Sequence, residues 1–189
     1  MTKFALHTKE TALPQAGEKL AAVEKAWQFV PNLHRILAES PETLEGYDAL
    51  FSLVGKTTLS PAEQQVVFLS INYENECEYC MAGHSVLAKM ADVPADAIAA
   101  LRENLPLADA RLEALHAFAG NVVRLRGNVG DAAVDAFLAA GFTKRNVLEV
   151  VLAVATKTIS NYVNHIAHTP NDAFMAQTAW TAPSRRAAA

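Results

Sequence analysis

The sequence predicts an all-α fold, and three observations support this prediction. Apolar residues recur at three- and four-residue spacing, as in the run from Leu44 to Val54, which is the period of an amphipathic helix. Alanine is abundant and runs of β-branched residues are short, which disfavours strands. Prolines, glycines and cap residues separate the periodic segments. We therefore expect about eight to ten helices and no sheet.

The expected helices follow one another between these turn signals. They cover 16–29, 32–38, 41–55, 60–74, 77–90, 94–103, 109–125, 130–139 and 143–167, with ends uncertain by about 2–4 residues. Their boundaries are set in order by Pro31-Asn32, Ser40-Pro41, Ser60-Pro61, Asn75, Val93-Pro94, Leu105-Pro106, Gly127-Asn128, Gly141 and Thr169-Pro170, since such residues start or stop helices. The runs Ser60-Pro-Ala-Glu63 and Asn75-Glu-Cys-Glu78 have the pattern of capping boxes.

We take residues 1–180 as a single helical domain and residues 181–189 as a flexible C-terminal tail. A chain of 189 residues, 51% of them hydrophobic, is long enough to bury one core, whereas the tail has little to bury. A weak internal similarity relates Ser60–His84 to Thr143–His168. It suggests that the domain consists of two related helical halves, of which the first carries the thiols.

Charge and hydropathy exclude two classes of partner. The net charge is −4, with 20 acidic and 16 basic residues interspersed, so the basic surface that nucleic acid requires is missing. No uncharged apolar run approaches the roughly 20 residues needed to cross a bilayer, and the first residues show no apolar signal segment. We expect a cytoplasmic protein that binds neither nucleic acid nor membranes.

Both cysteines of the chain lie in the motif Cys77-Glu-Tyr-Cys80, and a histidine follows at His84. In a reducing compartment such a close pair is more often redox-active or metal-binding than a structural disulfide. At the start of a central helix, Cys77, Cys80 and His84 share one face. The helix N-terminus favours a thiolate at the first cysteine and, more weakly, one turn further on.

His84 and Glu74 are the candidates for proton transfer. His84 follows Cys80 by one helical turn, so it can accept the thiol proton and later protonate a leaving oxygen. Glu74 lies just before Cys77 and can orient the imidazole directly or through water. An ordinary exposed carboxylate is an equally good interpretation of Glu74.

Two simpler interpretations of the thiol pair stay open. Free cysteine is among the most buried residue types, so both can be small core residues. Zinc is the second alternative, and His165 and His168 can complete such a site in space, although no second C-x-x-C follows. His165 is otherwise a satisfied buried histidine or a catalytic one. The two-residue spacing of the cysteines, their place at a helix start and the histidine that follows together favour redox chemistry without a metal or cofactor.

The run Leu59-Ser-Pro-Ala-Glu63, followed by Asn75-Glu-Cys-Glu-Tyr-Cys80-Met-Ala-Gly-His84, resembles the AhpD-like branch of the carboxymuconolactone decarboxylase superfamily. The resemblance is specific over residues 59–90 and looser elsewhere. It implies an all-α fold assembled into trimers or hexamers. It also implies that Cys80 attacks a hydroperoxide substrate, that Cys77 resolves the sulfenate to a disulfide, and that a dithiol or lipoyl-bearing protein is the reductant.

The sequence departs from the family pattern at one position. The family usually carries a glutamate where this chain has Gln65, and glutamine cannot accept a proton, so Glu74 is the candidate for a relocated carboxylate. We expect a thiol-dependent alkylhydroperoxidase in antioxidant defence that uses Cys80, Cys77, His84 and Glu74. The alternatives are a thiol–disulfide reductase, or a redox-sensing oligomeric subunit without peroxidase turnover.

Overall fold

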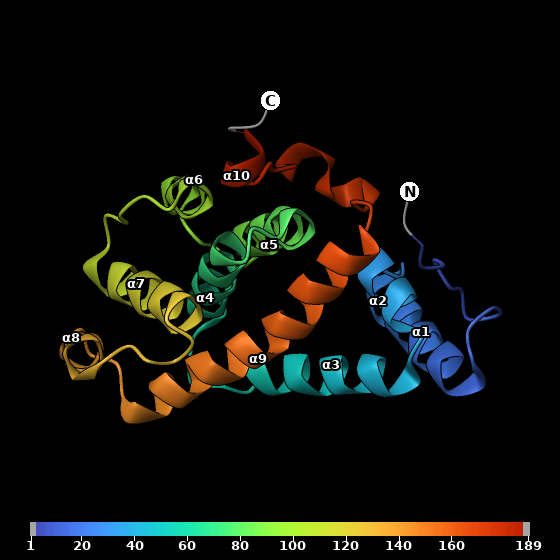
Figure 1. Ribbon diagram of the computed structural model, residues 1–189, viewed down its shortest axis with the longest axis horizontal. Helices are drawn as coiled ribbons and strands as arrows, with labels where there is room; N and C mark the ends of the chain where they lie inside the picture. The colour runs from blue at the N-terminus through green and yellow to red at the C-terminus, as the bar shows by residue number, and fades with distance from the viewer. Residues whose placement is uncertain (1–2, 187–189) are drawn as a thin grey trace.

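The computed structural model describes residues 3–186, and within this range the chain is helical without β-strands (Figure 1). The helices are α1 (Pro14–Trp27), α2 (Asn32–Leu37), α3 (Pro41–Val54), α4 (Pro61–Glu74), α5 (Glu78–Met90), α6 (Ala95–Glu103), α7 (Ala110–Arg124), α8 (Asp131–Ala139), α9 (Lys144–Ala167), the 3₁₀ helix η1 (Ala173–Thr178) and α10 (Pro183–Arg186). The predicted all-α fold and its nine helices are confirmed, whereas η1 and α10 were not predicted.

Capping explains where the two helices around the thiol motif begin. The hydroxyl of Ser60 accepts a hydrogen bond from the Glu63 N–H, and the Glu63 carboxylate accepts one from the Ser60 N–H at 2.8 Å. This capping box confirms the predicted start of α4. The second predicted capping box is wrong, because Asn75 ends α4 and its side-chain amide donates to Asn161 at 2.8 Å. Cys77 itself is the N-cap of α5, with no side-chain cap.

Helices α4 and α5 lie at the centre of the molecule and contact elements on all sides (Figure 1). Helices α6 and α7 pack on one side of this pair, with α8 against α7, and α1, α2 and α3 lie on the other side. Two clusters of buried apolar residues result, one around α4 and α7 and one around α1–α3. Helix α5 contributes to both: Met81 and Ala88 belong to the first cluster, Cys77 and Cys80 to the second.

Helix α9 crosses the molecule and contacts α2, α3, α4, α5 and α7 (Figure 1). Its buried face carries an unusual number of polar side chains: Asn146, Glu149, Thr156, Lys157, Ser160, Asn161 and Asn164. Among residues 3–186, no helix combines the length and the apolar composition that a membrane span requires. The part of this polar face that carries Lys157, Asn161 and Asn164 is turned toward α4 and the thiol motif on α5.

Residues beyond the expected domain boundary at residue 180 still contact the helical domain. Ala182 is buried, and its N–H donates to the Glu78 carboxylate at 3.0 Å. Ser184 bonds Glu76, and Arg186 forms an ion pair with Glu103 at 2.6 Å. The prediction of a flexible tail is therefore wrong for 181–186, because the segment carries cap and charge partners for α5 and α6. Residues 187–189 lie outside the described part of the chain.

Candidate active site

A tight connection between α4 and α5 positions both cysteines. Glu76 has φ = 51°, a left-handed conformation that turns the chain sharply, and the Cys77 N–H then donates to the Asn72 carbonyl at 3.0 Å. Cys77 and Cys80 follow at the N-cap and in the first turn of α5, both buried and both free thiols. The predicted placement of the motif at a helix start is confirmed.

Cys80 lies in surroundings that stabilise a thiolate. The side-chain amide of Asn164 donates to its Sγ at 3.1 Å, and to Cys77 Sγ at 3.8 Å. Burial by itself raises the pKa of Cys80. A hydrogen bond from the Cys77 thiol, the positive charge of Lys157, and hydrogen bonds from Ser160 and Lys157 outweigh burial, so the pKa of Cys80 lies well below its ordinary value.

The pKa of Cys77 shifts in the opposite direction. Burial, and next the hydrogen bond and negative charge of Cys80, raise the pKa of Cys77 well above its ordinary value. The sequence argument expected the helix N-terminus to favour a thiolate at Cys77 first. That order is wrong, because the dipole is a modest effect and a buried group beside a thiolate is held neutral.

His84 is held by two partners, neither of them a cysteine. Its Nε2 lies 3.0 Å from Lys157 Nζ, and its Nδ1 lies 2.8 Å from Gln65 Oε1. An ammonium has no acceptor, so Nε2 accepts from Lys157 and Nδ1–H donates to the Gln65 amide; this tautomer is assigned from the network. Burial, and then the charge of Lys157, lower the pKa of His84 well below its ordinary value. The imidazole is therefore neutral.

Lys157 is the residue that sequence reasoning missed. It is 1% exposed, it lies 5.5 Å from the centre of the Phe68 ring, and it contacts both His84 and Cys80. A buried lysine needs a negative or strongly polar partner. The signal was present in the sequence, because Lys157 shares the helical stripe of Val150, Ala153 and Asn164, all of which are buried.

Glu74 does not reach the thiols or His84. Its carboxylate forms an ion pair with Arg124 of α7 at 2.5 Å and lies against Gly120, where an added Cβ would be 3.2 Å from Oε1. Burial raises the pKa of Glu74, and Arg124 opposes that shift. The predicted role of Glu74 in orienting His84 is wrong, since Gln65 occupies the position at Nδ1.

In the described part of the chain, the side chains of Tyr79 and His165 have no hydrogen bond to either cysteine or to His84. The Tyr79 hydroxyl donates to the Asp172 carboxylate and accepts from the Leu33 N–H at 3.2 Å. Tyr79 therefore fixes α5 to α2 and to the segment after α9. His165 is exposed rather than buried. The interpretation of His165 as a satisfied buried histidine is therefore wrong.

An apolar cavity leads to Cys80. Its inner part, 70 Å³ in volume, is lined by Cys80, His84 and Lys157. It adjoins an outer part of 650 Å³, and the two share Trp27, Pro31, Phe51, Leu87 and Phe174 as lining residues. The reacting sulfur is thus approached through an aromatic and aliphatic passage.

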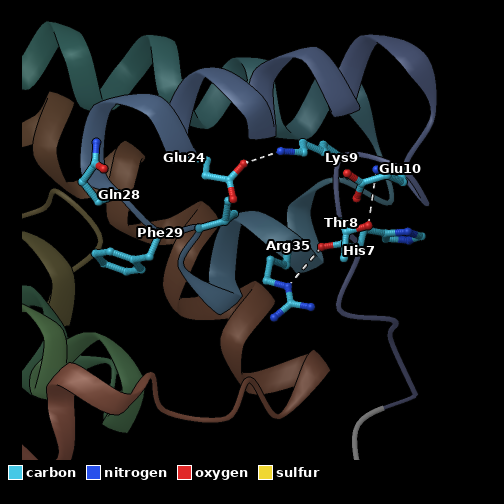
Figure 2. Close-up of a pocket in the computed structure, with 9 residues that line it drawn as sticks. His7, Thr8, Lys9, Glu10, Glu24, Gln28, Phe29 and Arg35 are labelled. Carbon is cyan, nitrogen blue, oxygen red and sulfur yellow. Dashed lines mark hydrogen bonds and ion pairs between the residues drawn. The ribbon is translucent and has the colours of Figure 1, made fainter.

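Two further observations concern other parts of the molecule. A hollow of 550 Å³ at the N-terminal segment is lined by paired polar groups: Lys9 bonds Glu24 at 2.8 Å, and Arg35 bonds the His7 carbonyl at 3.1 Å (Figure 2). Neither thiol lines it. In the range 3–186, no three histidine, cysteine or carboxylate side chains converge in a way that fits a metal ion.

Residues 41–120 match the carboxymuconolactone decarboxylase family. No curated protein matches the sequence. The fold is similar to that of an uncharacterized peroxidase-related protein with an AhpD core from Ralstonia eutropha JMP134, with a TM-score of 0.81 and 18% identity over 92% of this chain and 94% of that one. A peroxidase-related protein from Silicibacter sp. TM1040 is also similar, with a TM-score of 0.79 and 19% identity over 92% and 93% of the two chains.

A third similar structure has a different activity. It is the debrominase Bmp8 in complex with 2,3,4-tribromopyrrole, with a TM-score of 0.72 and 16% identity over 87% of this chain and 89% of that one. At these identities the structural likeness establishes the fold, and the fold serves more than one enzymatic reaction. The match to the carboxymuconolactone decarboxylase family covers residues 41–120, and the fold of the described residues is AhpD-like.

Proposed function

We propose that the chain is a thiol-dependent peroxidase that reduces hydroperoxides through Cys77 and Cys80. The observation that carries the proposal is the unequal surroundings of the two neighbouring thiols: Asn164 Nδ2 lies 3.1 Å from Cys80 Sγ and 3.8 Å from Cys77 Sγ, and Lys157 contacts Cys80. The pKa of Cys80 is lowered and that of Cys77 is raised. A peroxidase of this kind needs one thiolate to attack and one protonated thiol to resolve.

The first step forms an S–O bond and breaks the O–O bond of the substrate. The Cys80 thiolate attacks the terminal oxygen of the hydroperoxide, which leaves an alkoxide and a sulfenic acid. The alkoxide takes a proton from Lys157, the cation that contacts both Cys80 and His84. His84 is a positioning residue in this scheme, because its Nε2 already accepts from Lys157 and orients the ammonium.

The second step joins the two sulfurs. Sγ of Cys77 attacks Sγ of Cys80, the S–O bond breaks, and the hydroxide takes the Cys77 proton and leaves as water. The sum of the two steps is one hydroperoxide and two thiols giving one alcohol, one water and one disulfide. No metal or organic cofactor enters this balance.

The cavity that leads to Cys80 supports an organic hydroperoxide as substrate. Its lining is dominated by side chains such as Trp27, Phe51 and Phe174, which favour a ligand with an aromatic or aliphatic body. Transfer of such a body from water gains about 25 cal/mol per Å² of apolar surface. Hydrogen peroxide has no such surface and is expected to react more slowly.

The activity is tested by counting thiols and turnovers. Reduced protein is mixed with one equivalent of cumene hydroperoxide, free thiols are measured, and dihydrolipoamide is then added in excess with more peroxide. The proposal expects two thiols lost for each peroxide and repeated turnover with the dithiol. Disulfide formation without turnover identifies a redox sensor, and turnover with disulfide substrates alone identifies a thiol–disulfide reductase; either result contradicts the peroxidase.

A further inference from the structure

We propose that Lys157 keeps its proton only while the sulfur of Cys80 is a thiolate, so that disulfide formation releases a proton from Lys157 and reduction of the disulfide returns it. The proposal rests on the proposed function and deepens it, because it couples the redox equilibrium of the thiol pair to a buried amine. The site then exchanges two protons along with its two electrons, one proton at Cys77 and one at Lys157.

Lys157 lies where an ammonium needs a negative group in contact. Its side chain is 1% exposed and lines the inner part of the cavity together with Cys80 and His84. Nζ lies 3.0 Å from Nε2 of His84, a neutral imidazole, and 5.5 Å from the centre of the Phe68 ring. These neutral partners do not balance a charge, and a buried charge without an opposite partner is strongly unfavourable.

The Cys80 sulfur is the negative group in contact with Lys157. In the described part of the chain, no carboxylate forms an ion pair with Lys157, and the inner part of the cavity is lined by none. The other titratable side chains around the cavity and the sulfur are neutral or paired elsewhere: His84, protonated Cys77, Tyr47, whose pKa is raised by burial, Tyr79 with Asp172, and His34 with Asp48 at 3.2 Å. The charge on Lys157 therefore depends on the redox state of Cys80.

Disulfide formation removes this negative group. Once Sγ of Cys80 is bonded to Sγ of Cys77, an ammonium would remain in an apolar cavity beside a neutral imidazole. Burial favours the uncharged form of an amine, and a buried lysine readily changes its protonation state. The proton that Lys157 gives to the leaving alkoxide is therefore not replaced until the disulfide is reduced. The reduced site holds a thiolate and an ammonium, the oxidised site holds a disulfide and an amine, and the net charge is zero in both.

Gln65 suits a site that stays neutral. Its Oε1 accepts a hydrogen bond from Nδ1–H of His84 at 2.8 Å, and a side-chain amide adds no charge in either redox state. A glutamate at this position would place a negative charge on the other side of the imidazole and would stabilise a proton retained on Lys157 in the disulfide form. The amide of Gln65 therefore favours release of the proton on oxidation.

The test compares two pH profiles of the same protein. The equilibrium between the thiol pair and dithiothreitol is determined between about pH 6 and pH 7.5, where both thiols of dithiothreitol stay protonated, and alkylation of Cys80 is followed by mass spectrometry over the same range. Oxidation of dithiothreitol releases two protons. If the protein takes up both, at Cys77 and Lys157, the equilibrium constant for reduction of the disulfide does not change with pH. If Lys157 keeps its proton in the disulfide form, the protein takes up one, and this constant rises about tenfold for each unit of pH.

Two substitutions at Lys157 separate the charge from the proton. Lys157→Arg retains a positive charge that it cannot release, so alkylation of Cys80 should stay constant while the equilibrium constant rises about tenfold for each unit of pH. In Lys157→Met, Cys80 loses its cation and its alkylation should fall as the pH is lowered, whereas the equilibrium constant should not change because both protons bind to sulfur. Lys144→Arg, at the exposed start of α9, is the matched control and should behave as wild type.

The wild-type protein is expected to show constant alkylation of Cys80 and a constant equilibrium with dithiothreitol. The proposal is overturned if the wild-type equilibrium constant rises about tenfold for each unit of pH with alkylation unchanged, if alkylation of Cys80 falls as in an ordinary thiol, or if the constant of Lys157→Arg does not rise. The wild-type result decides alone where Lys157→Arg does not fold. No hydroperoxide is used, so a protein that behaves as expected but does not consume hydroperoxides refutes the proposed function alone, and turnover with a pH-dependent constant refutes the proton coupling alone.

Discussion

The two sides of the Cys77–Cys80 pair differ in almost every physical property. The Cys80 side is apolar, and it contains one buried cation, Lys157, within reach of the sulfur. The Cys77 side is polar and lined by histidines and paired charges. Two sulfurs on one turn of helix thus acquire different reactivity from their neighbours. The sequence spacing brings the two thiols together, whereas Lys157 and Asn164 of α9 give them different surroundings.

Substitutions on the two sides should impair different steps of the reaction. Replacement of the two sulfurs themselves has the largest expected effect. Cys80→Ser should abolish hydroperoxide consumption, because no thiolate remains to attack. Cys77→Ser should react once and then stop as a sulfenic acid on Cys80, since resolution is a separate step. Mass spectrometry after one equivalent of peroxide, with dimedone to trap the sulfenate, distinguishes the two. If Cys80→Ser carries the sulfenate instead, the roles are reversed.

Removal of the buried cation should have the next largest effect. In Lys157→Met the Cys80 thiolate loses its positive partner and the alkoxide loses its proton donor, so oxidation near pH 7 should slow by about 10²–10⁴-fold. The pKa of Cys80 should rise toward and above its ordinary value, so part of the rate should return as the pH is raised. Lys144→Met, at the exposed start of α9, is the matched control. A Lys157→Met protein with an unchanged pH–rate profile would exclude Lys157 from the reaction.

A smaller effect is expected at Glu74. Since its carboxylate pairs with Arg124 and does not reach His84, Glu74→Gln should oxidise Cys80 at a rate within about twofold of wild type. The substitution should lower the free energy of unfolding by no more than about 1 kcal/mol, which is the usual contribution of a half-exposed ion pair. Stopped-flow oxidation and urea unfolding measure the two quantities. A tenfold slower oxidation of Cys80 in Glu74→Gln would show that Glu74 takes part in proton transfer, which contradicts this prediction.

Substitutions on the outer face of α9 are expected to have the smallest effect on oxidation and reduction of the thiol pair. This face exposes Leu148, Val151, Tyr162 and Ile166, and such a stripe is commonly covered by another subunit. We expect a trimer or hexamer in sedimentation velocity experiments. Leu148→Glu should shift the distribution toward monomer and leave the oxidation rate of Cys80 nearly unchanged. A wild-type monomer at micromolar concentration would contradict the oligomer.

The fold was predictable from sequence because helix starts depend on local chemistry. Ser60 and Pro61, for example, define the start of α4 without any tertiary contact. The same argument failed at Asn75, where the side chain bonds Asn161 of α9. It also failed for residues 181–186, where buried Ala182, next to buried Trp180, anchors the C-terminal segment. These errors share one cause, namely a long-range partner that no local pattern encodes.

The candidate site was predictable in part for the same reason. The spacing of Cys77, Cys80 and His84 is local, and the structure does bring them onto one helix. The partners that set their protonation are not local: Gln65 is on α4, and Lys157 and Asn164 are on α9. Proximity in sequence suggested Glu74 as the partner of His84, but Glu74 points toward α7. The pattern of buried positions along α9 was the available signal for Lys157.

The central claim is that Cys80 is a thiolate while Cys77 remains protonated, and site-resolved alkylation tests it most directly. Reduced wild-type protein is treated briefly with iodoacetamide between about pH 6 and pH 8, and tandem mass spectrometry assigns the label within the peptide. Because an ordinary thiol has a pKa of about 8.5, its labelling falls nearly tenfold for each unit of pH below that value. The account predicts that labelling of Cys80 stays almost constant over this range, with Cys77 unlabelled. Preferential labelling of Cys77, or a Cys80 rate that falls with pH as in an ordinary thiol, would contradict it.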